Sequence, residues 1–247
     1  MFAHKSVNTK LVAFLLFACA LTFVSIAHGQ RRRAPGGGMR AVIVDERLAA
    51  LRSEPSLTAP LVQRLSRGRN VSITGTRRAS DGITFHRVAV TRRTRGWLQA
   101  ESLVSPARVG DDEKLLRLIR GSEDVDRIAR ARISLDLFPR SPLRPAVLLI
   151  FGDAAEEAAV KLSRQADRRL NENEMRAGGA PEFSYALNYN GLDRYNRHGV
   201  TFTYDRATQS YHYDGGSWQE ILRRYPRSPE AMEARKRLSL MSVSSAR

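Results

Sequence analysis

The stretch VSITGTRRASDGITFHRVAVTRRTRGWL, residues 71–98, decides the fold of the first half of the chain. Residues 71–75 and 85–90 alternate apolar and polar side chains, which is typical of half-buried strands. The turn ASDG separates these two segments, and an arginine-rich turn precedes the GWL of residues 96–98. The stretch therefore predicts consecutive short strands joined by tight turns.

Two earlier apolar runs, at residues 41–44 and 61–65, extend the same pattern toward the N-terminus. About five short strands within residues 40–105 predict a small closed β-barrel, because closure removes exposed strand edges. The remainder, residues 106–247, has helical periodicity. The expected fold class is therefore α+β and multidomain.

The order of the strand segments resembles the bacterial Src-homology-3-like (SH3-like) family. The family pattern is a Leu-Arg strand, a Pro-Ser turn, a polar-Gly turn before an alternating strand, and a terminal Gly-Trp. The chain reads LRSEPS at residues 51–56, RG at 67–68, VSITG at 71–75, FHRV at 85–88 and GWL at 96–98. Glu54 stands where the family usually has Gly, beside the usual ligand groove, and Phe85 stands where it usually has Trp. The resemblance covers about a quarter of the chain and implies a barrel that binds cell-wall peptide or glycan, or another partner.

Four residues of this barrel are the candidate ligand-binding set: Arg52, Phe85, Arg87 and Trp97. The two aromatic rings could line a groove, with the two guanidinium groups beside it. Trp97 fits core packing equally well. No metal site and no cofactor are expected.

The first 29 residues predict a secretory signal peptide. Lys5 and Lys10 form a basic head, residues 11–27 are uncharged and mostly apolar, and small residues near Ala27 suit cleavage. The expected location is therefore the periplasm or the cell envelope. The alternative is an uncleaved anchor, because the run is close to the roughly 17 residues that a short spanning helix needs. Cys19 lies inside the run, so a mature chain would have no thiol nucleophile and no thiolate metal site.

Residues 30–39, QRRRAPGGGM, predict a flexible basic linker, and no later segment could span a membrane. The whole chain has 41 Lys and Arg against 25 Asp and Glu, a net charge of +16. An anionic partner would explain this balance, and so would a general preference for arginine, because the arginines are spread along the chain.

The C-terminal half contains one motif twice, FPRSP at residues 138–142 and YPRSP at 225–229, each between two helical segments. These units resemble the helical hairpins of tetratricopeptide proteins, which present a groove to a protein partner. They lie 87 residues apart, whereas that family repeats every ~34 residues. Gly152-Asp153 is a possible break in the helix that follows the first motif.

A tyrosine-rich insert, about residues 183–216, lies between the two units. Residues 200–204 and 210–213 alternate strictly and predict a β-hairpin with aromatic cross-strand pairs. The tyrosines could form a stacking platform for sugars or bases, but an aromatic mini-core is favoured. Four side chains in this region carry atoms that could ligate a metal, but they lack a tight ligand spacing, so a solvated histidine is expected and not a ligand: His198, Asp205, His212 and Asp214.

Together these patterns predict a non-catalytic exported scaffold, whose barrel binds an envelope ligand and whose helical half binds a protein partner. One alternative is a glycan-processing enzyme with its site in the insert, which would need two converging acids such as Asp193 with Asp205 or Asp214. Another is a basic nucleic-acid-binding protein, which export disfavours. The acidic pair Glu156-Glu157 is expected on a surface salt-bridge face.

Overall fold

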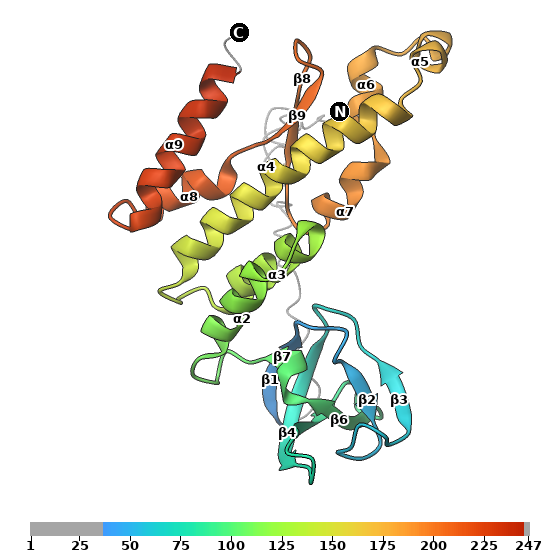
Figure 1. Cartoon of the computed structure of the whole chain (residues 1–247), viewed down its shortest axis with the longest axis vertical. Helices are drawn as coiled ribbons and strands as arrows, with labels where there is room; N and C mark the ends of the chain where they lie inside the picture. Colours follow the sequence, from blue (N-terminus) through green and yellow to red (C-terminus); the bar gives the residue numbers. More distant parts are fainter. Residues whose placement is uncertain (1–36, 245–247) are drawn as a thin grey trace, which may run out of the picture. The chain divides into compact units, whose positions relative to one another are not determined.

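The structure is a computed structural model that describes residues 37–244. The predicted signal peptide, Cys19 and most of the predicted linker lie outside these residues. No helix within residues 37–244 is long and apolar enough to cross a membrane. The described chain is mixed α and β, with a sheet formed by the first part and helices dominating the second (Figure 1).

Seven strands form one antiparallel sheet in the order β3-β2-β6-β5-β4-β1-β7. Their bounds are β1 Met39–Ile43, β2 Ala50–Arg52, β3 Leu61–Arg64, β4 Asn70–Arg78, β5 Thr84–Ala89, β6 Arg95–Gln99 and β7 Leu103–Val104, with a 3-10 turn, η1 Ala100–Ser102, before β7. The strand predictions are confirmed, although β4 is longer than expected.

The expected closure of the sheet into a barrel is wrong, because β3 and β7 end the strand order and do not pair with each other. The last strand has only two residues, and the chain then enters helix α2 (Asp111–Arg120). The Lys114 ammonium of α2 donates to the carbonyl oxygens of Leu103 and Ala100, at 3.0 and 3.1 Å. Helix α2 thus covers this edge, which is a way of protecting it other than closure.

The inner face of the sheet encloses a small core that includes Ile43, Leu51, Val88 and Leu98. Gly96 is essential to it, because an added Cβ would lie 2.6 Å from the Arg52 carbonyl oxygen and 2.8 Å from Leu51 Cγ. The glycine of the Gly-Trp pair therefore allows β2 to approach β6.

Helices form two consecutive pairs, α3 (Asp124–Leu137) with α4 (Arg144–Arg169), and α8 (Gly216–Arg224) with α9 (Pro229–Ser244). The FPRSP and YPRSP segments join the members of each pair. Helix α4 packs against α3, α8 and α9 (Figure 1). An ion pair of 3.1 Å joins Arg237 of α9 to Asp153 of α4. The two helical units therefore touch across the insert.

The possible break at Gly152-Asp153 is wrong, because α4 continues through both residues. An added Cβ at Gly152 would lie 2.4 Å from Nε1 of Trp218, whose side chain is 1% exposed. The glycine provides space for a buried indole and does not end the helix.

After α4 comes the short helix α5 (Glu172–Gly178). The insert then consists of α6 (Glu182–Leu187), η2 (Asn190–Leu192), α7 (Asp193–Asn196), β8 (Phe202–Asp205) and β9 (Ser210–Tyr213). The hairpin is confirmed, with Tyr204 opposite Tyr211 and Phe202 opposite Tyr213. Tyr195, Tyr211 and Tyr213 are at most 3% exposed. These three rings therefore form the favoured mini-core and are not a stacking platform.

Two arginines connect the sheet to α3. Arg130, 5% exposed, donates through Nε to the Val44 carbonyl oxygen at 2.9 Å and through Nη1 to Ser122 Oγ at 2.6 Å. Arg67 donates to both carboxylate oxygens of Asp126, at 2.6 and 2.9 Å. Val42 and Val104 of the sheet, and Val44 directly after β1, also pack into the helical core. The predicted domain boundary near residue 105 thus falls where strands give way to helices, at a contact that has both charged and apolar parts.

Candidate functional site

Three of the four predicted site residues lie in one row across the sheet. Arg52 on β2 is the cross-strand partner of Trp97 on β6, and Trp97 is the partner of Arg87 on β5. Directly paired residues project from the same face of a sheet. The row therefore places the indole between two guanidinium-bearing side chains, on the face opposite the Leu51–Leu98 core.

The ends of the row extend this surface. Gly75 of β4 is the partner of Arg87, and an added Cβ there would lie 3.7 Å from the Arg87 Cβ. Leu61 of β3 is the partner of Arg52 and is 50% exposed. No side chain therefore projects beside Arg87 at position 75, and the apolar side chain of Leu61 borders Arg52.

The fourth predicted residue, Phe85, lies on the same face of β5 but is only 1% exposed. Its side chain is buried, so Phe85 is not placed to contact a ligand directly. Alternation along β5 accounts for the face on which this side chain lies, but not for its burial.

Two neighbouring rows add basic side chains. Arg95 of β6 pairs with Ala89, and Arg77 of β4 pairs with Phe85. Arg77, Arg87 and Arg95 are exposed, while Arg52 and Trp97 are half-buried. Arg52 is fixed by a hydrogen bond of 2.6 Å from Nη1 to the Ala59 carbonyl oxygen. We call these five residues the arginine–tryptophan face.

No carboxylate occurs among the paired residues of these three rows. Guanidinium groups bind carboxylates and phosphates through paired hydrogen bonds. A partly exposed indole stacks on apolar or sugar surfaces. The face is therefore suited to an extended anionic ligand that also has flat or apolar parts.

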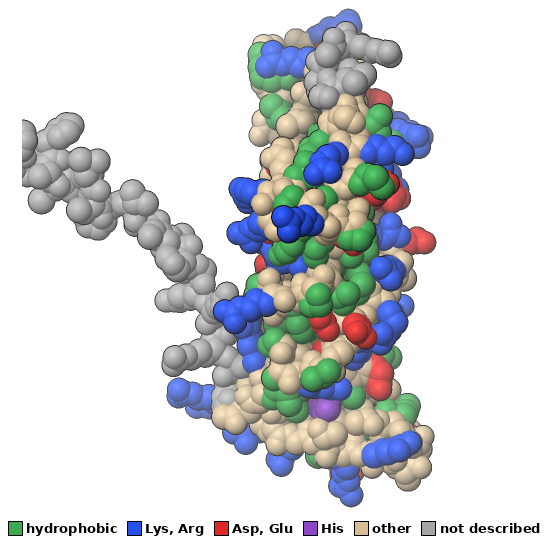
Figure 2. Space-filling model, turned by 90° about the vertical axis from the view of Figure 1, so that its left-hand side faces the viewer, with side chains coloured by type: hydrophobic (Ala, Val, Ile, Leu, Met, Phe, Trp, Pro, Cys, Tyr) green, Lys and Arg blue, Asp and Glu red, His purple; other side chains and the backbone are tan. Residues whose placement is uncertain are grey.

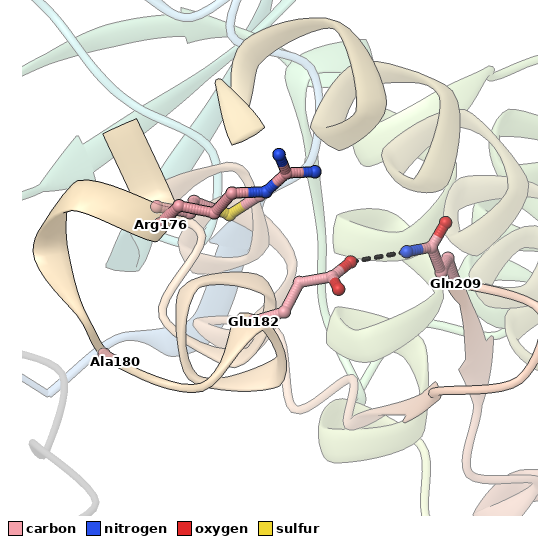
Figure 3. Close-up of a pocket in the computed structure, with 5 residues that line it drawn as sticks. Arg176, Ala180, Glu182 and Gln209 are labelled. Carbon is pink, nitrogen blue, oxygen red and sulfur yellow. Dashed lines mark hydrogen bonds between the residues drawn. The ribbon is translucent and has the colours of Figure 1, made fainter. Parts of the chain in front are cut away.

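A hollow that the sequence did not predict lies at the tip of the hairpin. Figure 3 shows Arg176, Ala180 and Glu182 on one side of it and Gln209 of the hairpin loop on the other. The volume of the hollow is ≈ 310 Å³. Gln209 Nε2 donates to Glu182 Oε1, and the Arg206 guanidinium lies 3.7 Å from the centre of the Phe183 ring. These contacts hold the hairpin loop against α6, so we interpret the hollow as part of that attachment.

Helix α4 covers the free edge of β9. The backbone amide groups of Tyr211 and Tyr213 donate to Ser163 Oγ and Glu156 Oε2, both at 2.8 Å. The expectation that His212 is only solvated is wrong, because its Nδ1 lies 3.1 Å from Glu156 Oε1. Glu157, by contrast, lies on a surface ion-pair face with Lys161, as predicted.

Ser210, His212 and Glu156 have the connectivity of a serine-hydrolase triad, since Ser210 Oγ lies 3.1 Å from His212 Nε2. Ser210 Oγ also lies 2.7 Å from Thr208 Oγ1, and the other oxygen of Glu156 binds the backbone of β9. A triad also requires donors for an oxyanion and a cavity beside the nucleophile. None of the cavities characterised within the described chain is lined by Ser210. We therefore assign these three side chains to attachment of the hairpin.

Two acids of the glycan-processing alternative, Asp205 and Asp214, accept local hydrogen bonds from neighbouring residues. Asp205 accepts hydrogen bonds from the Ala207 amide and the Thr208 hydroxyl, and these bonds hold the pKa of Asp205 below its usual value. Asp214 accepts from the Gly216 amide at 2.9 Å. A general acid needs a raised pKa, so Asp205 is unsuited to that role. Within residues 37–244 no group of three or more His, Cys, Asp or Glu side chains could hold a metal ion.

No model of a protein family matches the chain, and no curated protein or solved structure resembles it significantly. The likeness to SH3-like and tetratricopeptide proteins therefore depends on the motifs quoted above. Function has to be argued from the surfaces themselves.

Proposed function

We propose that this chain is a non-catalytic, exported binding protein whose arginine–tryptophan face holds the peptide and glycan of the cell wall. The observation that carries the proposal is the Arg52–Trp97–Arg87 row, which has exposed arginines beside it and no acid among its pairs. Wall peptides carry carboxylates that guanidinium groups can bind, and an indole can stack on sugar rings. Binding of this kind requires no cofactor.

We further propose that the sheet is an SH3-like unit, although its strand order is open. The packing of its motif residues supports this assignment. Leu51 and Leu98 face the core, Gly96 lets their strands meet, and Arg52 and Trp97 pair on the opposite face. Each residue of the Leu-Arg and Gly-Trp motifs thus has a defined place in one small sheet.

The helical half is proposed to bind a protein partner in the manner of tetratricopeptide hairpins. Contact between α4 and α9 supports this, because stacked helical pairs require it. Met232 and Leu240 of α9 are 70% and 60% exposed. Export is proposed from the apolar run at residues 11–27 and its small-residue cleavage site.

Co-sedimentation with purified peptidoglycan sacculi, at low and high salt, tests the wall-binding proposal. The protein is the full chain without its predicted signal peptide. The test variant is R87E/R95E, which reverses two exposed charges of the face. The matched control is R227E/R235E, which makes the same charge change at exposed positions of the helical half.

The wild-type protein and the control variant should pellet with sacculi at both salt concentrations, while R87E/R95E should bind at least about tenfold more weakly. Each lost charged hydrogen bond is worth about 1.5–3 kcal/mol when well formed and less at an exposed position. Equal pelleting of the test variant and the wild type would refute the role of the face. Pelleting that disappears in high salt would show nonspecific charge attraction and would remove the claim of specific wall binding.

A further inference from the structure

A separate cavity of ≈ 510 Å³ lies between the second half of α4 and the η2–α7 segment of the insert. Its donors come from both sides: Gln165 and Arg169 of α4, and Tyr189, Asn190, Arg194 and Arg197 of the insert. It shares no residue with the arginine–tryptophan face. The predicted function of the chain does not use it.

The charge of the lining is strongly unbalanced. Three guanidinium groups, those of Arg169, Arg194 and Arg197, surround the cavity together with a single carboxylate, that of Asp193. The excess is two positive charges. A phosphate monoester carries about 1.5–2 negative charges at neutral pH, so it would balance this excess.

Arg194 is held rigidly in this lining. Its Nη2 donates to Tyr195 Oη at 2.8 Å, and its guanidinium lies 4.7 Å from the centre of the Tyr195 ring. Tyr195 is fully buried and donates to Asp124 Oδ1 at 2.7 Å. Burial and the hydrogen bond to Asp124 raise the pKa of Tyr195, so its hydroxyl stays protonated. The guanidinium is therefore positioned before any ligand arrives.

Two buried polar atoms of the lining have no hydrogen-bond partner, the Tyr189 hydroxyl oxygen and Arg194 Nε. Tyr189 is only 7% exposed. Its ring presses against Gly191, where an added Cβ would lie 2.4 Å from Tyr189 Cε1. A fixed, buried donor without a partner is unfavourable, and such groups are characteristic of sites that a ligand or a water molecule completes.

We infer that this cavity binds the phosphate dianion, as inorganic phosphate or as the terminal group of a phosphate monoester. Guanidinium groups form paired hydrogen bonds with phosphate oxygens, while the Tyr189 hydroxyl and the side-chain amides of Gln165 and Asn190 can donate to the remaining oxygens. The site requires only residues of the helical half, so it does not depend on wall binding by the sheet.

Isothermal titration calorimetry on the full chain without its predicted signal peptide tests this inference. The probes are inorganic phosphate and glycerol 1-phosphate, at constant ionic strength set with chloride. The variants are Y189F, which removes only the unpartnered hydroxyl, and R169Q/R197Q. The matched control is R164Q/R168Q, because both arginines are exposed on α4 and neither lines the cavity.

The wild-type protein, the control and R87E/R95E should each bind one phosphate with a saturable isotherm. R169Q/R197Q should bind roughly tenfold or more weakly, because it loses charged hydrogen bonds. Y189F should also lose affinity while its melting temperature without phosphate stays equal to or above that of the wild type. That combination distinguishes a ligand contact from a structural hydroxyl.

Absence of saturable binding at millimolar phosphate would overturn the inference, and so would equal weakening by the control variant. A lower melting temperature of Y189F with unchanged affinity would overturn the role of Tyr189. Flotation with vesicles of phosphatidylcholine, with and without phosphatidic acid, then identifies the source. Binding that requires phosphatidic acid and is lost in R169Q/R197Q indicates a lipid phosphate, and phosphate binding without flotation indicates a soluble one.

Discussion

Replacement of Gly152 by alanine should destabilise the protein, against the usual effect of this change in a helix. Alanine is favoured over glycine by about 1 kcal/mol in a helix interior. Here the new Cβ would lie 2.4 Å from Trp218 Nε1 and 2.6 Å from Ser217 Oγ. These contacts are about 1 Å shorter than van der Waals packing allows.

The neighbours of this Cβ cannot easily move, because Trp218 is 1% exposed and Ser217 is 6% exposed. Overpacking of a well-filled core costs about 1–3 kcal/mol, and this contact belongs near the upper limit. After subtraction of the gain in helix propensity, the expected net loss is about 1–2 kcal/mol. For a chain of this size that loss lowers the melting temperature by about 2–8 °C.

Urea unfolding and thermal unfolding, both followed by circular dichroism, measure this loss. A double-mutant cycle with W218L provides the control, because leucine lacks the ring atoms Nε1 and Cε2 that the Cβ meets. G152A should cost about 1 kcal/mol less in the W218L background, which is the coupling expected of residues in contact. A G152A protein that is more stable than the wild type would refute the close approach of α4 and α8 at this glycine.

Three further predictions concern the sheet, the insert and the contact between sheet and helices. G96A should lower the free energy of unfolding by about 2–3 kcal/mol through overpacking against the Arg52 carbonyl oxygen; an unchanged urea midpoint would contradict the packing. The chain should not react with a fluorophosphonate probe, and labelling that disappears in S210A would disprove the non-catalytic proposal. The hydrogen bond and positive charge of Arg67 lower the pKa of Asp126 in the folded protein, so its contribution to stability is present above the unfolded pKa of about 4 and is lost as the pH falls through the folded value. D126N should therefore lower the urea midpoint more at pH 7 than at pH 3, and equal losses at both values would exclude the ion pair as the cause.

The sequence named Arg52, Arg87 and Trp97 as candidates but did not predict that they form one row. Period-2 alternation explains why they share a face once their strands pair. Arg52, Arg87 and Trp97 needed only a correct strand pairing to meet. The depth of Phe85 was not predictable in this way, because it depends on what covers that end of the sheet. Local pattern thus locates a surface better than it locates the residues exposed on it.

Features that depend on contacts between distant segments were missed. The sheet stays open because α2 covers its β7 edge, where Lys114 donates to the Leu103 carbonyl oxygen. No strand pattern contains that information. A glycine in a helical pattern signals either a break or a close approach, and only the position of Trp218 decides between them at Gly152. The phosphate cavity likewise combines α4 with a segment some twenty residues further along the chain, without a motif in either.

The net charge of +16 has more than one origin in the structure. Figure 2 shows Lys and Arg side chains scattered over the whole face that it displays, without a single basic patch. Some arginines are structural, since Arg67 and Arg130 fix the sheet to α3. Others are exposed on the arginine–tryptophan face or line the cavity beside α7. Because these last two groups lie on different elements, a wall fragment and a phosphate need not compete, and charge reversal at one group should leave ligand binding at the other largely unchanged.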